Sequence, residues 1–217
     1  MRERQKAERR ETILKCAERL FSRDGIDATT VTAIAEAAGV SPPTVFNYFG
    51  SKENILSTIV FEGTEKARSE SLQQMMLTDC PFDEVIAGVM FAMTDKTIAI
   101  AGKRIWRYAE AAHIRRAGTE FQRRFDFDDL ALRALIVDFL NAYDIALLNR
   151  SEPDTGVLAD LVFDRWSARY FEFIKDDDMP LTTHRKILQK DAAALVPLVF
   201  TPQFAARSPL KKQEAAQ

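Results

Sequence analysis

The sequence has little of what a secreted, disulfide-stabilised or membrane-spanning protein needs. Only Cys16 and Cys80 are cysteines among the 217 residues, and their spacing fits neither a metal site nor a redox motif. We therefore expect free thiols in a reducing compartment. The charged N-terminus lacks the apolar core of a signal peptide, and the most apolar run, 86–94, is followed by Asp95 and Lys96, well short of a membrane span. These features predict a cytoplasmic protein with no membrane partner.

Catalytic and metal-binding patterns are equally scarce. His113 and His184 are the two histidines, and no Ser/His/Asp or Cys/His constellation is suggested. The stretch "FGSK" lacks the upstream glycine of a phosphate-binding loop. The acidic runs "DFDD" and "DDD" do not follow a calcium-loop pattern and are typical of solvated loops or helix starts. We expect no enzyme, no cofactor and no bound metal.

The net charge of −2 gives no global indication of a polyanionic partner, but the charge is unevenly spread. Residues 1–52 hold 9 Lys/Arg against 7 Asp/Glu, whereas the remainder holds 21 against 25. A basic N-terminal part joined to an acidic remainder is compatible with local nucleic-acid binding. A difference of this size does not establish it.

Apolar residues three and four apart dominate the chain, while alternating strand-like runs are scarce, so we predict an all-α fold of nine to ten helices. Gly25 is placed for a left-handed position after the first helix, and Ser51 is the expected N-cap of the fourth. From residue 202 periodicity is weak, which predicts a flexible tail. The expected helices span 5–23, 31–38, a short segment ending near 49, 52–76, 82–98, 103–116, 119–149, 155–175 and 182–199.

Two short helices joined by a tight turn lie within residues 30–49. Thr30 is a good N-cap for the first of them, and Gly39 makes the turn. The small residues Ala35 and Ala38 allow the two helices to approach closely. This spacing matches a helix-turn-helix, whose second helix protrudes into a DNA major groove.

Two consecutive prolines, Pro42 and Pro43, precede the second short helix. The first amides of a helix have no intrahelical partner, so proline there removes donors that would be unpaired anyway. Because Pro43 disfavours helical dihedrals at Pro42, two placements stay open. Either Pro42 is the cap and Pro43 begins the helix, or Ser41 is the cap and its hydroxyl reaches only the Thr44 amide.

The faces of this helix suggest its role. Val45 and Phe49 are four residues apart and suit the buried side, whereas Thr44, Asn47 and Tyr48 share the opposite face. Asparagine can pair with adenine, threonine can contact a thymine methyl or a phosphate, and a tyrosine hydroxyl can donate to phosphate. Taken alone, these residues favour an ordinary solvated face on a short core helix.

The segments "ETILKCAERLF", "GIDATTVTAIAEAAGVS" and "TVFNYFGSKENIL" together resemble the N-terminal DNA-binding domain of the TetR (tetracycline repressor) family of bacterial transcription regulators. The resemblance covers about residues 11–56 with its spacing intact and does not extend into 57–217. It implies a helix-turn-helix domain over 1–52 and an effector-binding and dimerisation domain over 53–201, followed by the tail at 202–217.

By position, the resemblance implies DNA contacts from Thr30, Thr32, Pro43, Thr44, Asn47, Tyr48 and Lys52, the last a phosphate contact. Phe46 stands where family members commonly have tyrosine, and without the hydroxyl it cannot hydrogen-bond a phosphate. Whether it contacts DNA or only packs stays open. The basic residues Arg2, Arg4, Lys6, Arg9 and Arg10 either reach the DNA backbone or form a solvated helix end. Interleaved glutamates favour the second alternative.

The resemblance also implies a small-molecule pocket enclosed by helices five to seven and a four-helix bundle shared by two subunits. Core packing is the alternative role of each candidate. Candidate effector residues are Met90, Met93, Arg104, Trp106, Arg107, Tyr108, His113, Phe121, Phe125, Phe139 and Tyr143. Candidate dimer residues are Leu158, Leu161, Val162, Trp166, Tyr170, Leu188, Leu195 and Leu198.

The resemblance therefore implies a homodimeric, ligand-responsive transcription regulator, a repressor that binds double-stranded operator DNA with near-palindromic sequence and leaves it when an unknown effector binds. The alternative hypothesis is a helix-turn-helix DNA-binding structural or division protein without an effector. A solid core in the second domain would favour that alternative.

Overall fold

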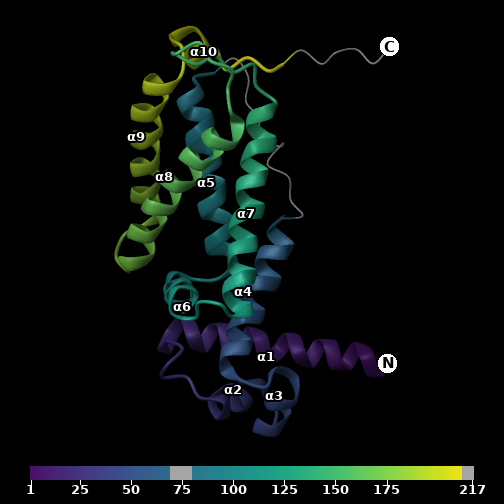
Figure 1. Ribbon diagram of the computed structural model, residues 1–217. Helices are drawn as coiled ribbons and strands as arrows, with labels where there is room; N and C mark the ends of the chain where they lie inside the picture. Colours follow the sequence, from purple (N-terminus) through teal and green to yellow (C-terminus); the bar gives the residue numbers. More distant parts are fainter. Residues whose placement is uncertain (69–79, 212–217) are drawn as a thin grey trace, which may run out of the picture. The chain divides into compact units, whose positions relative to one another are not determined.

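The computed structural model describes residues 1–68 and 80–211, and all regular structure within these ranges is helical apart from two isolated bridges. This confirms the all-α prediction. In the described part of the chain, no single helix is long and apolar enough to cross a membrane. The helices, labelled as in Figure 1, are α1 (Arg2–Asp24), α2 (Val31–Ala38), α3 (Pro42–Phe49), α4 (Lys52–Arg68), α5 (Phe82–Ile100), α6 (Lys103–Arg115), α7 (Glu120–Asn141), α8 (Thr155–Lys175), α9 (Leu181–Val199) and α10 (Pro202–Arg207).

The chain forms two compact units. The first combines Met1–Ala67 with Thr97–Asp126, and the second combines Arg68–Lys96 with Phe127–Gln217. In the first unit α1 packs against both α2 and α6. The predicted domain boundary after residue 52 therefore falls inside a compact unit, because α4 and α6 belong to the same body as the three N-terminal helices.

Side-chain caps fix the starts of the short helices. The Thr30 hydroxyl accepts a hydrogen bond from the Ala33 amide at 3.1 Å, and the Ser51 hydroxyl accepts one from the Asn54 amide at 3.1 Å. Both predicted caps are confirmed. Gly25 ends α1 with φ 86° and ψ 159°, a backbone conformation that side chains disfavour, although it lies outside the left-handed helical region. The predicted extension of α4 to Met76 lies outside the described residues.

The helix α7 ends at Asn141, eight residues before the predicted end. Beyond it, the Asp144 amide donates to the Pro209 carbonyl at 2.8 Å and the Leu148 amide to the Val199 carbonyl at 3.0 Å. The C-terminal segment thus supplies the partners that another turn of helix would have supplied. Sequence periodicity carries no information on such distant backbone pairing.

The same pairing explains why the predicted flexible tail is wrong for residues 202–211. The segment 202–207 forms α10, whose Phe204 is buried and packs edge-on against Phe82, with the ring centroids 4.7 Å apart. Phe200 and Tyr143 contact the same Phe82 ring, with centroids 5.0 and 5.4 Å away. The aromatic cluster buries apolar surface and so holds the segment in place.

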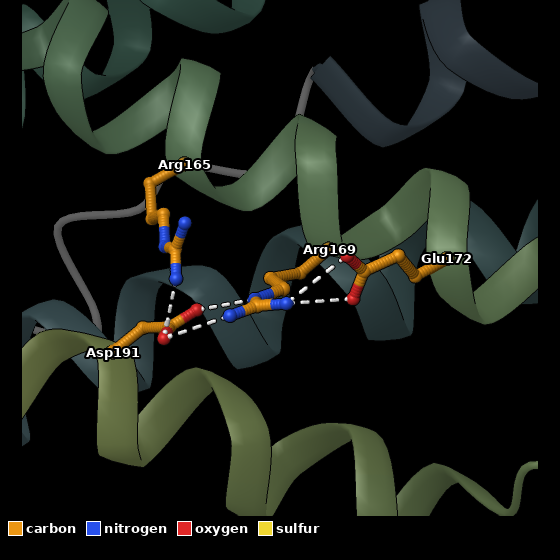
Figure 2. A network of polar contacts seen from close by, with 4 residues as sticks. All are labelled: Arg165, Arg169, Glu172 and Asp191. Carbon is orange, nitrogen blue, oxygen red and sulfur yellow. Dashed lines mark hydrogen bonds and ion pairs between the residues drawn. The ribbon is translucent and has the colours of Figure 1, made fainter.

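In the second unit, α8 and α9 lie side by side (Figure 1) and are joined by charged side chains (Figure 2). The Asp191 carboxylate of α9 accepts hydrogen bonds from Arg169 at 2.6 Å and Arg165 at 2.7 Å, and Arg169 also pairs with Glu172. Burial alone would raise the pKa of Asp191, but the hydrogen bonds from the two arginines outweigh it and hold that pKa below its usual value. Asp191 is therefore charged in the folded chain at neutral pH.

Candidate nucleic-acid interface

The turn between α2 and α3 is built on Gly39. Its φ of 66° and ψ of 33° are left-handed helical, the conformation that glycine adopts most easily. The Val40 amide donates to the Ala35 carbonyl at 3.0 Å, which closes the end of α2. Ile34 and Ala35 are fully buried where α2 packs against its neighbours. The predicted helix-turn-helix is therefore present.

The start of α3 settles the placement of the two prolines. Ser41 occupies the cap position, so Pro42 and Pro43 are the first and second residues of the helix. The Ser41 hydroxyl does not cap the Thr44 amide; it lies 2.8 Å from the Thr44 hydroxyl, while the amide bonds to the Ser41 carbonyl at 2.9 Å. The prolines remove only amides that the first turn leaves unpaired.

The predicted inward face of α3 is confirmed, because Val45 is 1% and Phe49 is 7% exposed. The predicted outward face is more graded. Asn47 is exposed, whereas Thr44 and Tyr48 are half-buried on its flanks. Asn47 is thus the predicted base-reading residue with the freest access to a partner.

Phe46 does not pack into the core, since 51% of its surface is exposed. With Pro43 and Asn47 it forms the most exposed line of the helix, which we name the α3 ridge. Phe46 and Asn47 follow Pro43 by three and four residues, and residues at these spacings share a helix face with it, so the spacing alone places all three on one side of α3.

At the start of α2, Thr30 and Thr32 are both exposed. The Thr30 oxygen accepts the Ala33 amide, and its hydroxyl hydrogen can still be donated. Both residues are therefore accessible to DNA, and their contacts with it stay predictions.

Lys52 has hydrogen-bond partners within the protein. Its ammonium donates to the carbonyls of Ile26 at 2.6 Å, Thr29 at 3.1 Å and Asp27 at 3.4 Å. The group expected on a DNA phosphate is therefore engaged with the loop between α1 and α2. An ammonium carries three donors, and all three are used here.

The basic N-terminal residues lie on α1, which begins at Arg2, three residues earlier than predicted. Most of them are exposed, but Arg10 is not available as a flexible arm residue. Its guanidinium pairs with both carboxylate oxygens of Glu62 and lies over the Phe49 ring, 5.5 Å from the centroid. Arg10 therefore ties α1 to α3 and α4. The exposed members of the group are Arg2, Arg4, Lys6 and Arg9.

The predicted effector residues are divided between the two compact units. Met90, Met93, Phe139 and Tyr143 belong to the second unit and are at most 2% exposed. The other seven belong to the first unit: Arg104, Trp106, Arg107, Tyr108, His113, Phe121 and Phe125. Tyr143 packs against Phe82 in the aromatic cluster, so core packing accounts for it.

Two polar candidates of this set have protein partners. Arg104 is exposed and donates to the Arg23 carbonyl at the end of α1; its role in a pocket stays a prediction. His113 places Nε2 2.7 Å from the Asp126 carboxylate and stacks on Phe125, with the ring centroids 4.5 Å apart. The carboxylate therefore orients the imidazole within the first unit.

The dimer prediction mixes core and surface residues. Five of its members are at most 6% exposed and belong to the core of the second unit, because α8 and α9 each turn one face inward: Leu158, Val162, Trp166, Tyr170 and Leu188. Leu161 and Leu198 are 43% and 75% exposed, and Val157, also on α8, is 56% exposed. Leu195 is half-buried. A small apolar depression between α8 and α9 is lined by Leu158, Leu161, Val162 and Leu195 together with residues of α5, α7 and α9 and with Phe200.

Known proteins share both the N-terminal segment and the fold. Residues 13–59 match the family described as bacterial regulatory proteins, tetR family. The HTH-type transcriptional regulator BetI of Rhizobium meliloti is 31% identical over 133 residues, 58% of this chain and 66% of BetI. UidR of Escherichia coli K12, also an HTH-type transcriptional regulator, is 33% identical over 58 residues, 27% of this chain and 30% of UidR. The chain thus spans less than two thirds of these relatives.

Among solved structures, the transcriptional regulator FadR of Bacillus subtilis in complex with stearoyl-CoA has a TM-score of 0.60 and 15% identity, and the comparison covers 86% of this chain and 98% of FadR. At that identity the likeness concerns the fold alone. The proteins matched in sequence are transcription regulators and not enzymes, in agreement with the expectation from the sequence. The helix-turn-helix and its match in sequence lead to one assignment: residues 13–59 form a DNA-binding domain of the tetR family of bacterial regulatory proteins.

Proposed function

We propose that the protein is a homodimeric transcriptional repressor that binds a near-palindromic operator in the cytoplasm and is released by a small-molecule effector. The observation that carries the proposal is the α3 ridge. Its three residues project from a helix whose opposite face is buried, directly after a tight glycine turn. A helix presented in this way can enter a major groove.

The side chains of α3 suit base reading more than phosphate binding. The Asn47 amide offers both a donor and an acceptor, the pattern that matches the major-groove edge of adenine. The exposed Phe46 ring offers apolar surface of the kind that contacts a thymine methyl. Thr44 and Tyr48 flank the ridge, and their hydroxyls can donate hydrogen bonds to the phosphates of the DNA backbone. The proposed site therefore favours A·T base pairs under the ridge.

Operator binding is tested by fluorescence anisotropy with DNA fragments that flank the protein's own gene, in competition with unrelated DNA. The wild-type protein should prefer one flanking fragment, and Asn47→Ala should weaken that preference by about tenfold, the effect of losing one bidentate base contact. Gln189→Ala, an exposed amide on α9, is the matched control and should behave as wild type. Equal binding of all fragments by the wild-type protein would refute the proposal.

The exposed apolar residues of α8 and α9 support the proposed homodimer. Val157 and Leu161 lie four residues apart on α8 and Leu198 lies on α9, which packs against α8, so these exposed apolar side chains offer surface that a second copy could cover. Because Leu198 and Ile114 are 75% and 74% exposed, Leu198→Glu and Ile114→Glu form a matched pair. Sedimentation at micromolar concentration should show a dimer for wild type and Ile114→Glu, and a monomer for Leu198→Glu. A dimer that survives Leu198→Glu would place the interface elsewhere.

An effector is proposed from family membership, since FadR of Bacillus subtilis has been solved with stearoyl-CoA. The test is a panel of acyl-CoA thioesters, aromatic acids and neutral aromatics, scored by release of the operator fragment. Release by one class, with a matching rise in melting temperature, supports an effector-controlled repressor. If no compound class acts and operator binding is intact, the alternative of a DNA-binding structural protein is favoured.

A further inference from the structure

The N-terminal turns of α1 project beyond the packed part of the first unit. The side chains of residues 1–9 are all exposed, whereas Arg10 is half-buried and Ile13 is fully buried. These turns extend past α2 and α3 (Figure 1). The start of α1 therefore makes no contribution to the core and is free to meet another molecule.

The core-facing side of α1 becomes cationic along these free turns. Ile13 and Ala17 are buried and lie four residues apart. The same spacing of three or four residues, continued toward the N-terminus, reaches Arg9, Lys6 and Arg2 in turn. Residues at these spacings share one helix face. We name these three cations the α1 track.

This side of α1 faces the helix-turn-helix. The Cys16 thiol donates to the Ala37 carbonyl near the end of α2, at 3.3 Å. Arg9 precedes Cys16 by seven residues, a spacing that returns to nearly the same side of a helix. Arg10, the next residue, lies over the Phe49 ring at the end of α3. The α1 track therefore lies on the side of the unit that carries the reading helix.

The glutamates that alternate with these cations in the sequence lie elsewhere on α1. Glu8 pairs with Arg4 at 3.2 Å and Glu11 pairs with Lys15 at 2.7 Å, both on the outer side of the helix. Glu3 lies in the first turn, where the helix dipole favours an acid. In the described part of the chain, no carboxylate pairs with a member of the α1 track. The helix thus separates an ion-paired outer side from a basic inner side.

The α1 track is unfavourable for the protein alone. Lys6 is four residues from Arg2 and three from Arg9, and like charges at these spacings destabilise a helix. Arg2 also lies at the N-terminus, where the partial positive charge of the helix disfavours a cation. An anionic partner along this side would offset both costs.

The reading segment supplies little positive charge of its own. Between Asp24 and Lys52 there is no lysine or arginine, while Asp27 and Glu36 are acidic. Neutralisation of phosphates by lysine and arginine supplies the sequence-independent part of DNA affinity. A protein that reads DNA with this segment therefore needs cations from outside it.

We propose that the α1 track binds phosphates of the operator beside the groove that α3 enters. Its three cations span about 10 Å of helix, and each DNA strand carries a phosphate at about every 3.4 Å of axis, so one strand can match all of them. The track then supplies a large part of the salt dependence of binding. The proposal rests on the proposed function, because it adds backbone contacts to the same DNA interface.

Two double variants separate phosphate binding from a general effect of charge. The track variant carries Lys6→Gln and Arg9→Gln, the members farther from the fraying helix end. The outer variant carries Arg4→Gln and Lys15→Gln, two exposed cations of the other side of α1. Both lower the net charge by the same amount and introduce a residue of similar helix propensity. Affinity for the preferred flanking fragment and for an unrelated duplex is measured at several salt concentrations, together with the melting temperature.

The track variant should lower the slope of log affinity against log salt by about 1.8 per subunit, about 0.9 for each lost phosphate contact. Its loss of affinity relative to wild type should therefore shrink about twelvefold per subunit between about 50 and 200 mM salt. Its preference for the flanking fragment should remain, since phosphate contacts carry no sequence information. The outer variant should keep the wild-type slope. The track variant should melt no lower than wild type, because it loses like-charge repulsion.

An unchanged slope in the track variant would show that this side is a solvated helix end, and an equal fall in both variants would reduce the effect to net charge. Either result overturns the proposal. If the wild-type protein prefers no fragment, the proposed function fails, and the slopes on the unrelated duplex still decide whether the α1 track binds phosphates.

Discussion

Gly63, in the interior of α4, is the position where a single added methyl group should have the largest effect on the first unit. A Cβ built on Gly63 would lie well inside van der Waals contact of Ile100 Cγ2 and 3.2 Å from Ile100 Cβ and Cγ1. Ile100 ends α5, and its β-branched side chain has little freedom to rotate away. Gly63→Ala must therefore push α4 away from Ile100 by about 1 Å, since carbon atoms pack at about 3.5–4 Å.

Two opposing terms set the size of the effect. Replacing glycine by alanine in a helix interior stabilises by about 1 kcal/mol, whereas overpacking costs about 1–3 kcal/mol. We expect a net loss of about 1 kcal/mol for Gly63→Ala, a fall in melting temperature of about 2–4 °C. Gly88→Ala is the matched control, because a Cβ on this α5 glycine would meet nothing within 4 Å, and it should raise the melting temperature by a similar amount.

The same substitution also tests whether the position of α4 matters for DNA binding. A displaced α4 carries Lys52 with it and should lower operator affinity about tenfold without any effector, a coupling of about 1.4 kcal/mol. Calorimetry and anisotropy report the two effects, and Ile100→Ala, which removes Cγ1 and Cγ2, should restore both in the double variant. If Gly63→Ala is as stabilising as Gly88→Ala and binds operator normally, the close contact does not position α4.

Three further predictions concern charge, apolar reading and buried polar contacts. Because the pKa of Asp191 is lowered in the fold, the charged carboxylate contributes fully to folding stability above about pH 4, and this contribution is lost as pH falls through the lowered pKa. Thermal melts at a series of pH values should show this loss in wild type and not in Asp191→Asn. Replacement of operator thymines by uracil should weaken wild-type binding about fourfold at the contacted base, the worth of one buried methyl, and should not affect Phe46→Ala; equal sensitivity of both proteins would exclude the ring as the reader. Thr94→Val should lower the free energy of unfolding by about 2 kcal/mol or more, because the Trp166 indole donates to the Thr94 hydroxyl at 2.9 Å inside the core. Thr182→Val, at an exposed position, should be neutral. Equal melting temperatures of the two variants would contradict a stabilising role of the Thr94 hydroxyl.

Local chemistry made much of the first unit predictable. The caps at Thr30 and Ser51, the turn at Gly39 and the buried pair Val45 and Phe49 follow from preferences that act within a few residues. The sequence therefore located the helices of the DNA-binding region. It did not reveal that Lys52 reaches back across more than twenty residues to a loop, because no local pattern encodes a carbonyl that the fold brings near.

The second unit was predicted less well for two physical reasons. Backbone pairing of 142–148 with the C-terminal segment ends α7 early and orders α10, and such pairing leaves no periodic signal. In α8, apolar residues occur on more than one side, and periodicity cannot tell which side meets the protein's own core. Trp166 therefore looked equivalent to Leu161, yet the first is 5% and the second 43% exposed.

The most direct test of the central claim is a footprint of the wild-type protein on the DNA that flanks its own gene. If the α3 ridge reads DNA from a two-fold dimer, protection should fall on two related half-sites whose centres are about 10 base pairs, or one helical turn, apart. Protection should disappear in Asn47→Ala at the same protein concentration. Uniform protection without half-sites, or a footprint that is identical in Asn47→Ala, would contradict the account.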